Sequence, residues 1–112
     1  MRILVANVNT TESMTEGIAA AARDVASPGT EIVGITPDFG AESCEGNFES
    51  YLAAIAVMDA VTRYEGEYDA VIQAGYGEHG REGLQELLTV PVVDITEAAA
   101  STAWNSIPAG MS

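Results

Sequence analysis

The stretch Tyr68–Gly80 reads YDAVIQAGYGEHG and decides the expected fold. Its apolar run around Val71 and Ile72 is typical of a short strand buried on both faces of a sheet. Glycines crowd the end of this run, and leucines at helical spacing follow them. The pattern predicts a strand that ends in a tight glycine loop and a helix that begins behind the loop. In parallel α/β sheets ligands bind at such strand ends, so the loop also locates the expected site.

The remaining sequence alternates between strand and helix patterns. Further strands are predicted at residues 3–8, 31–36 and 90–95. Amphipathic helices are predicted from Met14, Ile18, Ala21, Ala22 and Val25, from Phe48, Tyr51, Leu52, Ile55, Met58 and Val61, from residues 81–88, and from a last segment beginning at Thr96. This alternation indicates a single flavodoxin-like α/β domain.

The order of the strands follows from the connections between them. Right-handed crossovers and an early reversal of winding predict a four-stranded parallel sheet in the order 2-1-3-4, with helices on both faces. The reversal brings the ends of the first and third strands side by side. We therefore expect the loop at residues 7–11 to face the loop at 75–80 across one crevice, with the long loop 37–47 on the same rim.

The charge of the chain is strongly acidic. Seventeen Asp and Glu residues oppose four basic residues, all of them arginines, and the formal net charge is −13. This balance argues against binding to nucleic acid or to an anionic membrane surface. Two interpretations remain open, namely an ordinary solvated surface and an adaptation to high salt, in which repulsion is screened.

The cysteine content and the hydropathy of the chain limit its expected cellular location. Cys44 is the only cysteine, so no internal disulfide can form. This fits a reducing environment, and we expect a cytoplasmic protein. The N-terminal stretch lacks the apolar length of a signal peptide, and no run approaches the roughly 18 apolar residues that a membrane span requires.

The glycine loop is the first candidate for binding. Gly75, Gly77 and Gly80 would let the backbone expose N–H groups at a helix N-terminus, and Asn9 and Thr10 would add donors from the opposite loop. Such a cradle suits a carboxylate, a ureido carbonyl or a phosphate. A purely structural turn is the alternative, because the spacing is neither a P-loop nor a good dinucleotide fingerprint. We expect no cofactor.

Two titratable side chains are candidates for chemistry. His79 lies beside Glu78 in the glycine loop, where it is a candidate acid or base, although a lone loop histidine is usually solvated. Cys44 lies between Glu42 and Glu45, whose charges should raise the pKa of its thiol, and an incidental role is favoured. One histidine and one cysteine far apart in sequence do not predict a metal site.

Several stretches together resemble the N-terminal half of the aspartate/glutamate/hydantoin racemase superfamily, closest to hydantoin racemases. The stretches are MRILVANVNTTESMTE from Met1, TPDFGAES from Thr36, YLAAIAV from Tyr51, YDAVI from Tyr68, and ELLTVPVV from Glu86. The resemblance implies two similar α/β halves around one active site. It also implies cofactor-free racemisation, in which a cysteine from each half acts on opposite faces of the substrate α-carbon.

The resemblance covers residues 1–100 and leaves residues 101–112 as a tail, and the chain departs from the resembled pattern in three ways. Gly75 occupies the place of the first catalytic cysteine, and Val8 replaces the proline of an Asn-Pro-Asn turn. The half that would carry the second cysteine is absent, and residues 101–112 do not follow the family. The resemblance implies that Asn9, Thr10, Ser43, Gly75, Tyr76 and Gly77 would hold the polar groups of a small-molecule substrate.

Two functions remain open at this stage. The first is a hydantoin-racemase-like isomerase half-domain, inactive alone because Gly75 has no side chain to move a proton. The second is a non-catalytic α/β domain, degenerate or engineered, that self-associates and binds a small anion. We expect a homo-oligomer in either case, because a half-domain should expose apolar surface that a second copy can cover.

Overall fold

The computed structural model describes residues 1–44, 46–75 and 79–95, which form two helical layers around a parallel sheet. The strands are β1 (Arg2–Asn7), β2 (Glu31–Ile35), β3 (Ala70–Ala74) and β4 (Val92–Asp94). The helices are α1 (Glu12–Val25), α2 (Asn47–Arg63) and α3 (Arg81–Leu87). The strand order is β2-β1-β3-β4 and every pairing is parallel, so the predicted topology is confirmed.

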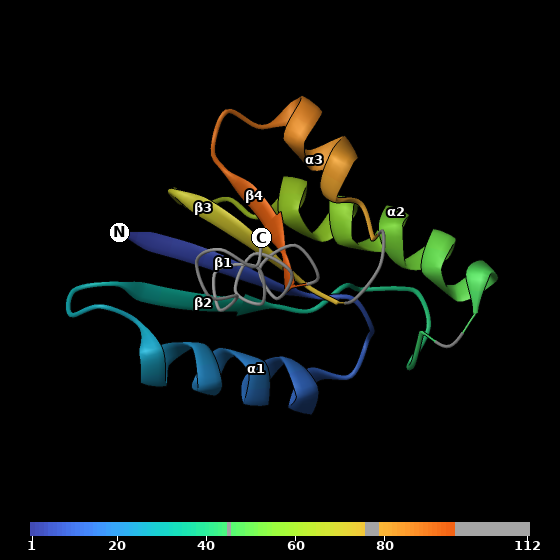
Figure 1. Cartoon of the computed structure of the whole chain (residues 1–112). Helices are drawn as coiled ribbons and strands as arrows, with labels where there is room; N and C mark the ends of the chain where they lie inside the picture. Colours follow the sequence, from blue (N-terminus) through green and yellow to red (C-terminus); the bar gives the residue numbers. More distant parts are fainter. Residues whose placement is uncertain (45, 76–78, 96–112) are drawn as a thin grey trace, which may run out of the picture.

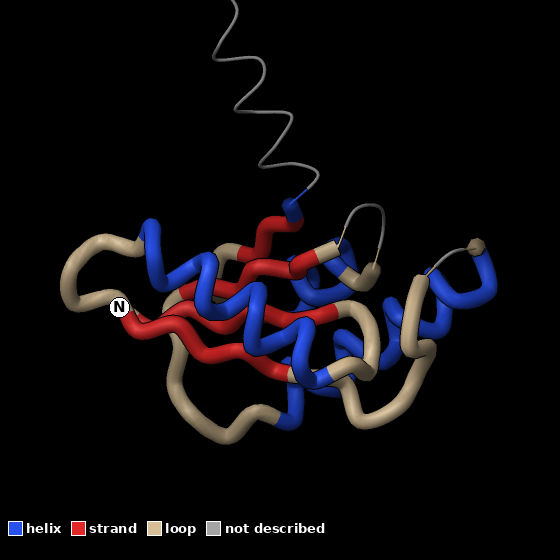
Figure 2. Tube along the Cα trace, turned by 90° about the horizontal axis from the view of Figure 1, so that it is seen from below, coloured by secondary structure: helices blue, strands red, loops and turns tan. Residues whose placement is uncertain are grey.

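The helices cover opposite faces of the sheet, as Figure 1 shows. Successive side chains of β1 point to opposite faces. Val5 therefore packs with Ala19 and Ile32 on the face that α1 covers. Figure 2 views the molecule from this side, with α1 lying across the strands. Leu4 and Ala6 join the larger cluster under α2 and α3. Because β1 is buried on both faces, its sequence is apolar without alternation.

Helix α1 packs on the sheet through part of the predicted face, because Ile18 and Ala22 lie against the core while other predicted positions do not. The predicted inner positions Met14 and Val25 are 50% and 86% exposed, and Ala21 is exposed as well. The buried positions are Thr15 and Ala19. A Cβ atom on Gly34 of β2 would lie only 2.9 Å from the Thr15 methyl group, so α1 contacts the sheet through small side chains.

Helix α2 also departs from the prediction. Its buried residues are Ala53, Ala56, Val57 and Val61, whereas Phe48, Tyr51 and Ile55 are 77%, 70% and 58% exposed. Both sides of the helix are apolar, so the spacing alone did not identify the packed side. The helix ends at Arg63.

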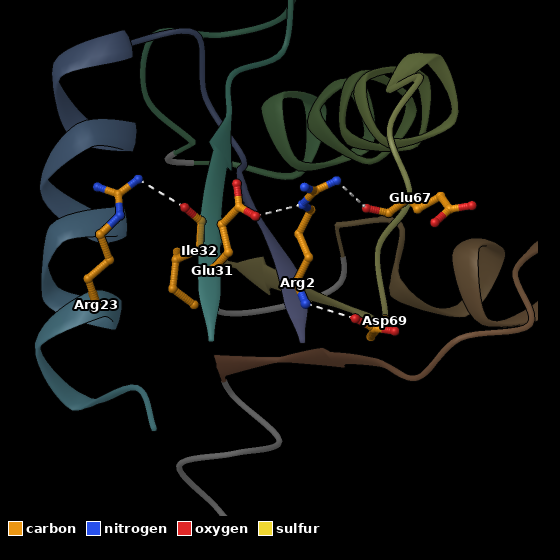
Figure 3. A network of polar contacts seen from close by, with 6 residues as sticks. All are labelled: Arg2, Arg23, Glu31, Ile32, Glu67 and Asp69. Carbon is orange, nitrogen blue, oxygen red and sulfur yellow. Dashed lines mark hydrogen bonds and ion pairs between the residues drawn. The ribbon is translucent and has the colours of Figure 1, made fainter. Parts of the chain in front are cut away.

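The amino ends of three consecutive strand segments are tied together by Arg2 (Figure 3). Its backbone N–H donates to Asp69 Oδ2 at 2.7 Å, its Nε to Glu31 Oε2 at 3.0 Å, and its Nη1 to the Glu67 carbonyl at 3.1 Å. Arg23 of α1 donates to the Ile32 carbonyl at 2.9 Å. The exposed pairs contribute little stability, but they fix this end of the sheet away from the expected site.

Two sequence-based expectations concern the ends of the described part. Strand β4 is shorter than predicted, because Pro91 lacks an N–H and the strand begins after it. The helix expected from Thr96 and the tail at 101–112 lie outside the described residues. No helix within the described ranges is long and apolar enough to cross a membrane.

Candidate functional site

A pocket of about 310 Å³ lies where β1 and β3 end. Its described lining residues come from the ends of β1 and β3, helix α1 and two loops, and they are Asn7, Val8, Asn9, Met14, Ile18, Ser43, Cys44, Ala74 and His79. The predicted crevice between the first and third strand ends is therefore present. The loop after β2 also reaches it through Ser43 and Cys44, as expected.

The turn after β1 is held by asparagine side chains. Asn7 is 1% exposed, and its Oδ1 accepts the Asn9 backbone N–H at 3.2 Å. Its Nδ2 lies 2.9 Å from Asn9 Oδ1 and 3.0 Å from Thr15 Oγ1. These bonds keep the turn closed although Val8 stands between the two asparagines. They also explain why a threonine occupies the inner face of α1.

Asn9 presents a donor to the pocket. Its Oδ1 accepts both the Asn7 amide and the Thr11 backbone N–H, the latter at 3.0 Å, which fixes the orientation of the side-chain amide. Its Nδ2 then meets Met14 Sδ at 3.6 Å, and a thioether is only a weak acceptor. A carbonyl or carboxylate oxygen in the pocket would be a better partner for this buried N–H₂ group.

The loop after β2 is fastened to the loop after β1 by backbone contacts. The Thr10 N–H donates to the Ala41 carbonyl at 3.1 Å, and the Thr11 hydroxyl donates to the Glu42 carbonyl at 3.3 Å. Thr10 itself is not among the lining residues, so of the predicted binding residues Asn9 and Ser43 line the pocket. Tyr76 and Gly77 lie outside the described residues.

Cys44 lies in the pocket, on the rim where its loop was expected, although the sequence favoured an incidental role for it. Its thiol donates to the Val8 carbonyl at 3.6 Å. Burial, and then the charge of Glu49, raise the pKa of the thiol above its ordinary value. The predicted direction is thus correct, but burial is the larger cause and the acid is Glu49, which α2 brings near the loop. The protonated thiol is a poor nucleophile.

His79 is buried, contrary to the interpretation of it as a solvated loop residue. It is 3% exposed, and its Nδ1 lies 3.4 Å from Nε2 of Gln73, which is fully buried in β3. Gln73 Nε2 also donates to the Gly75 carbonyl at 3.1 Å. The sequence held one signal for this contact, namely a glutamine in the middle of an otherwise apolar strand.

Gly75 does not line the pocket but lies directly behind it. A Cβ atom on Gly75 would lie 2.6 and 2.9 Å from the two methyl groups of Val8. The end of β1 and the end of β3 therefore touch through Val8 and Gly75, and Val8 is the one of the two that lines the pocket.

Comparison with known proteins agrees with this geometry. A family model for Asp/Glu/Hydantoin racemase matches residues 3–107. The chain belongs to this racemase family. The match runs past residue 100, and the boundary expected there stays a prediction because no described residue lies near it.

Solved racemases share the fold of this chain. The crystal structure of allantoin racemase from Pseudomonas fluorescens is 81% identical, with a TM-score of 0.92, over 94% of this chain and 45% of that one. Allantoin racemase from Klebsiella pneumoniae is 42% identical, with a TM-score of 0.87, over 94% and 43%. Hydantoin racemase of Paenarthrobacter aurescens is 41% identical over 88% and 43%. The chain thus spans less than half the length of each relative.

Proposed function

We propose that this chain forms one wall of a racemase site for a cyclic ureide, either allantoin or another 5-substituted hydantoin, and that it catalyses little racemisation by itself. Allantoin is a hydantoin with a ureido group at C5. The substrates named for the allantoin racemases and for the hydantoin racemase therefore share one ring. The observation that carries the proposal is the pocket at the ends of β1 and β3, which is lined by Asn9, a buried residue whose side-chain N–H₂ group meets the weak acceptor Met14 Sδ.

The chemistry explains the expected weakness. Racemisation removes the C5 proton on one face of the ring and returns a proton on the other face, so each face needs an acid or base. The family resemblance implies a cysteine at position 75, and Gly75 supplies no side chain. Loss of one such group typically removes about 10²–10⁴-fold of rate.

Binding would rely on donors that suit the ring carbonyls and the ureido group. Asn9 Nδ2 and the Ser43 hydroxyl belong to described lining residues, and we propose them as the substrate donors. Thr10, Gly75, Tyr76 and Gly77 stay predictions for the same role. No step in this scheme uses a cofactor or a metal ion.

His79 and Cys44 are the titratable groups among the described lining residues. We propose that His79 carries any residual proton transfer. In that case His79→Asn should remove the residual rate, whereas Cys44→Ser should leave most of it.

The test follows the circular dichroism of enantiopure allantoin and of a chiral 5-substituted hydantoin over time. We expect the chain to change the rate of decay little relative to buffer. Turnover at ordinary enzyme rates, about 1–10³ s⁻¹, would contradict the proposal. Gly75→Cys made together with Val8→Ala, which removes the methyl groups that a side chain at position 75 would meet, should increase the rate if position 75 is the position of the missing base.

Binding without catalysis is the second proposal. The Asn9 amide donor would serve a small anion as well as a carbonyl, and this function predicts the same absence of turnover. Titration with inorganic phosphate and with allantoin, followed by the Asn9 side-chain amide resonances, distinguishes the two. Binding of phosphate alone favours the anion site.

Self-association is proposed from the apolar stripe of α2, defined by Phe48, Tyr51 and Ile55. These side chains are spaced at i, i+3 and i+7, so they lie on one face of the helix. Sedimentation at moderate salt should show an oligomer that the triple change to serine dissociates. Val25→Ser, which alters an isolated exposed side chain on α1, is the control, and a monomeric wild-type chain would contradict the proposal.

A cytoplasmic location is also proposed. The support is the single cysteine, which is compatible with a reducing compartment.

A further inference from the structure

The contact between Val8 and Gly75 leaves no room for a side chain at position 75. A Cβ atom there would lie 2.6 Å from Val8 Cγ1, 2.9 Å from Val8 Cγ2 and 2.9 Å from Gln73 Nε2. Carbon atoms in ordinary contact are about 3.5–4.0 Å apart. Even the single methyl group of alanine would therefore require its neighbours to move.

The backbone is not what requires glycine at this position. Among the described glycines, Gly29, Gly40 and Gly80 have positive φ angles, and Gly75 does not. Its backbone conformation is thus open to an L-residue. The neighbouring side chains alone exclude a Cβ atom.

Neither neighbour can move away easily. Gln73 is fully buried, and its Nε2 donates to the Gly75 carbonyl at 3.1 Å. Val8 is 8% exposed and is part of the core under α2 and α3, while its carbonyl accepts the Cys44 thiol. A β-branched side chain has few rotamers, and both of its methyl groups face the glycine.

We propose that Val8 determines whether position 75 can carry a side chain, so that the two residues form an interdependent pair. A thiol or any other reactive group at position 75 then requires a smaller residue at position 8. The packing claim stands by itself, but its meaning for racemisation rests on the proposed function. It identifies Val8 as the residue that must change before a base can be restored.

The test is a double-mutant cycle in the full chain, with Gly75→Ala and Val8→Ala made singly and together. Urea unfolding gives the folding equilibrium constant of each variant. Overpacking by a methyl group typically costs about 1–3 kcal/mol, which is roughly a 5- to 150-fold loss in that constant. We expect Gly75→Ala to lower the folding equilibrium constant by this factor when Val8 is present. In the Val8→Ala background, the factor by which Gly75→Ala lowers the constant should be at least fivefold smaller.

Gly17→Ala is the matched control. Gly17 lies in α1, and a Cβ atom there meets nothing within 4 Å. The same chemical change should be neutral or stabilising at this position, because alanine favours a helix over glycine. It separates the effect of crowding from the effect of glycine replacement itself.

Each outcome decides the proposal. A cost of Gly75→Ala no larger than that of Gly17→Ala would overturn it, and so would an equal cost beside Val8 and beside its alanine replacement. Failure of Gly75→Ala to fold alone, with folding recovered in the double variant, would support it. Failure of both to fold would contradict it, because the second change should relieve the first. Racemisation by the wild-type chain would overturn the proposed function and leave the pairing intact.

A second readout uses Gly75→Cys in a Cys44→Ser background, so that the chain carries one thiol, and measures the yield of folded protein. The yield of folded protein should be at least fivefold higher when Val8→Ala accompanies it. An equal yield with and without the change at position 8 would overturn the pairing.

Discussion

Asn9 gives the pocket its clearest preference at the scale of single residues. Two donors bind its side-chain oxygen, and among the described residues its N–H₂ group meets the thioether of Met14. A buried donor with a weak partner gains most from a ligand oxygen. The site therefore favours molecules that present carbonyl or carboxylate oxygens, which cyclic ureides do.

His79 should carry its proton on Nε2. Gln73 Nε2 must be a donor because it meets the Gly75 carbonyl, so the His79 Nδ1 that lies 3.4 Å away acts as the acceptor. Long-range ¹H–¹⁵N correlation spectra test this directly, because the chain has one histidine. We expect the Nε2–H pattern at neutral pH.

A change of the amide to a carboxylate should reverse the tautomer. Gln73→Glu places an acceptor opposite Nδ1, and the proton should move to that nitrogen. Gln85→Glu is the control, because Gln85 donates to the Val92 carbonyl elsewhere. An Nδ1–H pattern in the wild-type chain would show that the assigned hydrogen bond is wrong.

Cys44 should make stability fall at alkaline pH. Burial raises the pKa of its thiol in the folded chain, so the folded state keeps the proton that the unfolded state loses near pH 8.5, which is about the ordinary value. The stabilisation is complete below that pH and is lost as pH rises through the folded value. Urea unfolding from pH 7 to pH 10 should show a steeper fall in the wild-type chain than in Cys44→Ser. Parallel curves would contradict the assignment.

The sequence allowed the location of the site to be predicted, but not its contacts. Alternating strand and helix patterns placed Asn9, Ser43 and the glycine loop on one rim. The burial of His79 and the approach of Cys44 depend on how loops far apart in sequence pack together, which local patterns do not encode. The two departures at Val8 and Gly75 looked independent in sequence, and they are neighbours in space.

At the scale of elements, the close approach of α2 and α3 depends on small residues. Gly80 caps α3 with φ +91°, and a Cβ atom there would lie 2.8 Å from the Ala54 carbonyl oxygen. Met58 of α2 also lies against Gly80 and Gly83, so the glycines of α3 make room for this side chain. Apolar periodicity therefore predicted the packed positions Met58 and Val61 correctly, but it also included Phe48, Tyr51 and Ile55, which are exposed.

Gly80→Ala should destabilise the chain more than a glycine replacement at an open turn. The left-handed conformation costs alanine about 1–2 kcal/mol, and crowding against α2 adds about 1–3 kcal/mol. Gly29→Ala is the matched control, since φ is +86° there and nothing lies within 4 Å. Thermal and urea unfolding should separate the two variants. Equal losses would mean that α2 does not crowd position 80.

At the scale of the whole molecule, the acidic charge should oppose folding at low salt. The net charge is −13, and exposed pairs such as Arg2–Glu31 and Arg63–Asp38 each contribute only about 0–1 kcal/mol. The screening length falls from about 30 Å at 0.01 M to about 10 Å at 0.1 M salt. The free energy of unfolding should therefore rise over this range.

The rise should be equal in NaCl and KCl, because screening depends on ionic strength and not on the cation. Urea unfolding in both salts checks this prediction. A constant or falling stability would show that repulsion is a minor term, and a difference between the salts would indicate specific ion binding.

The parallel order and the crevice at the reversal of winding belong to this scale too, and both were predictable from connection rules alone. The site is therefore set by topology first and by side chains second. A second pocket of about 300 Å³ lies at the opposite end of the sheet and is lined in part by Arg2, Glu31 and Asp69. Its residues serve as a control for ligand binding at the ends of β1 and β3.

The most direct test of the account is an amide chemical-shift map of the ¹⁵N-labelled chain titrated with allantoin. We predict saturable shifts at Asn9, Ser43 and Ala74, with Arg2 and Asp69 unchanged. Shifts confined to the Arg2 end, or no shifts at all at high allantoin concentration, would contradict the claim that the ends of β1 and β3 form the binding site.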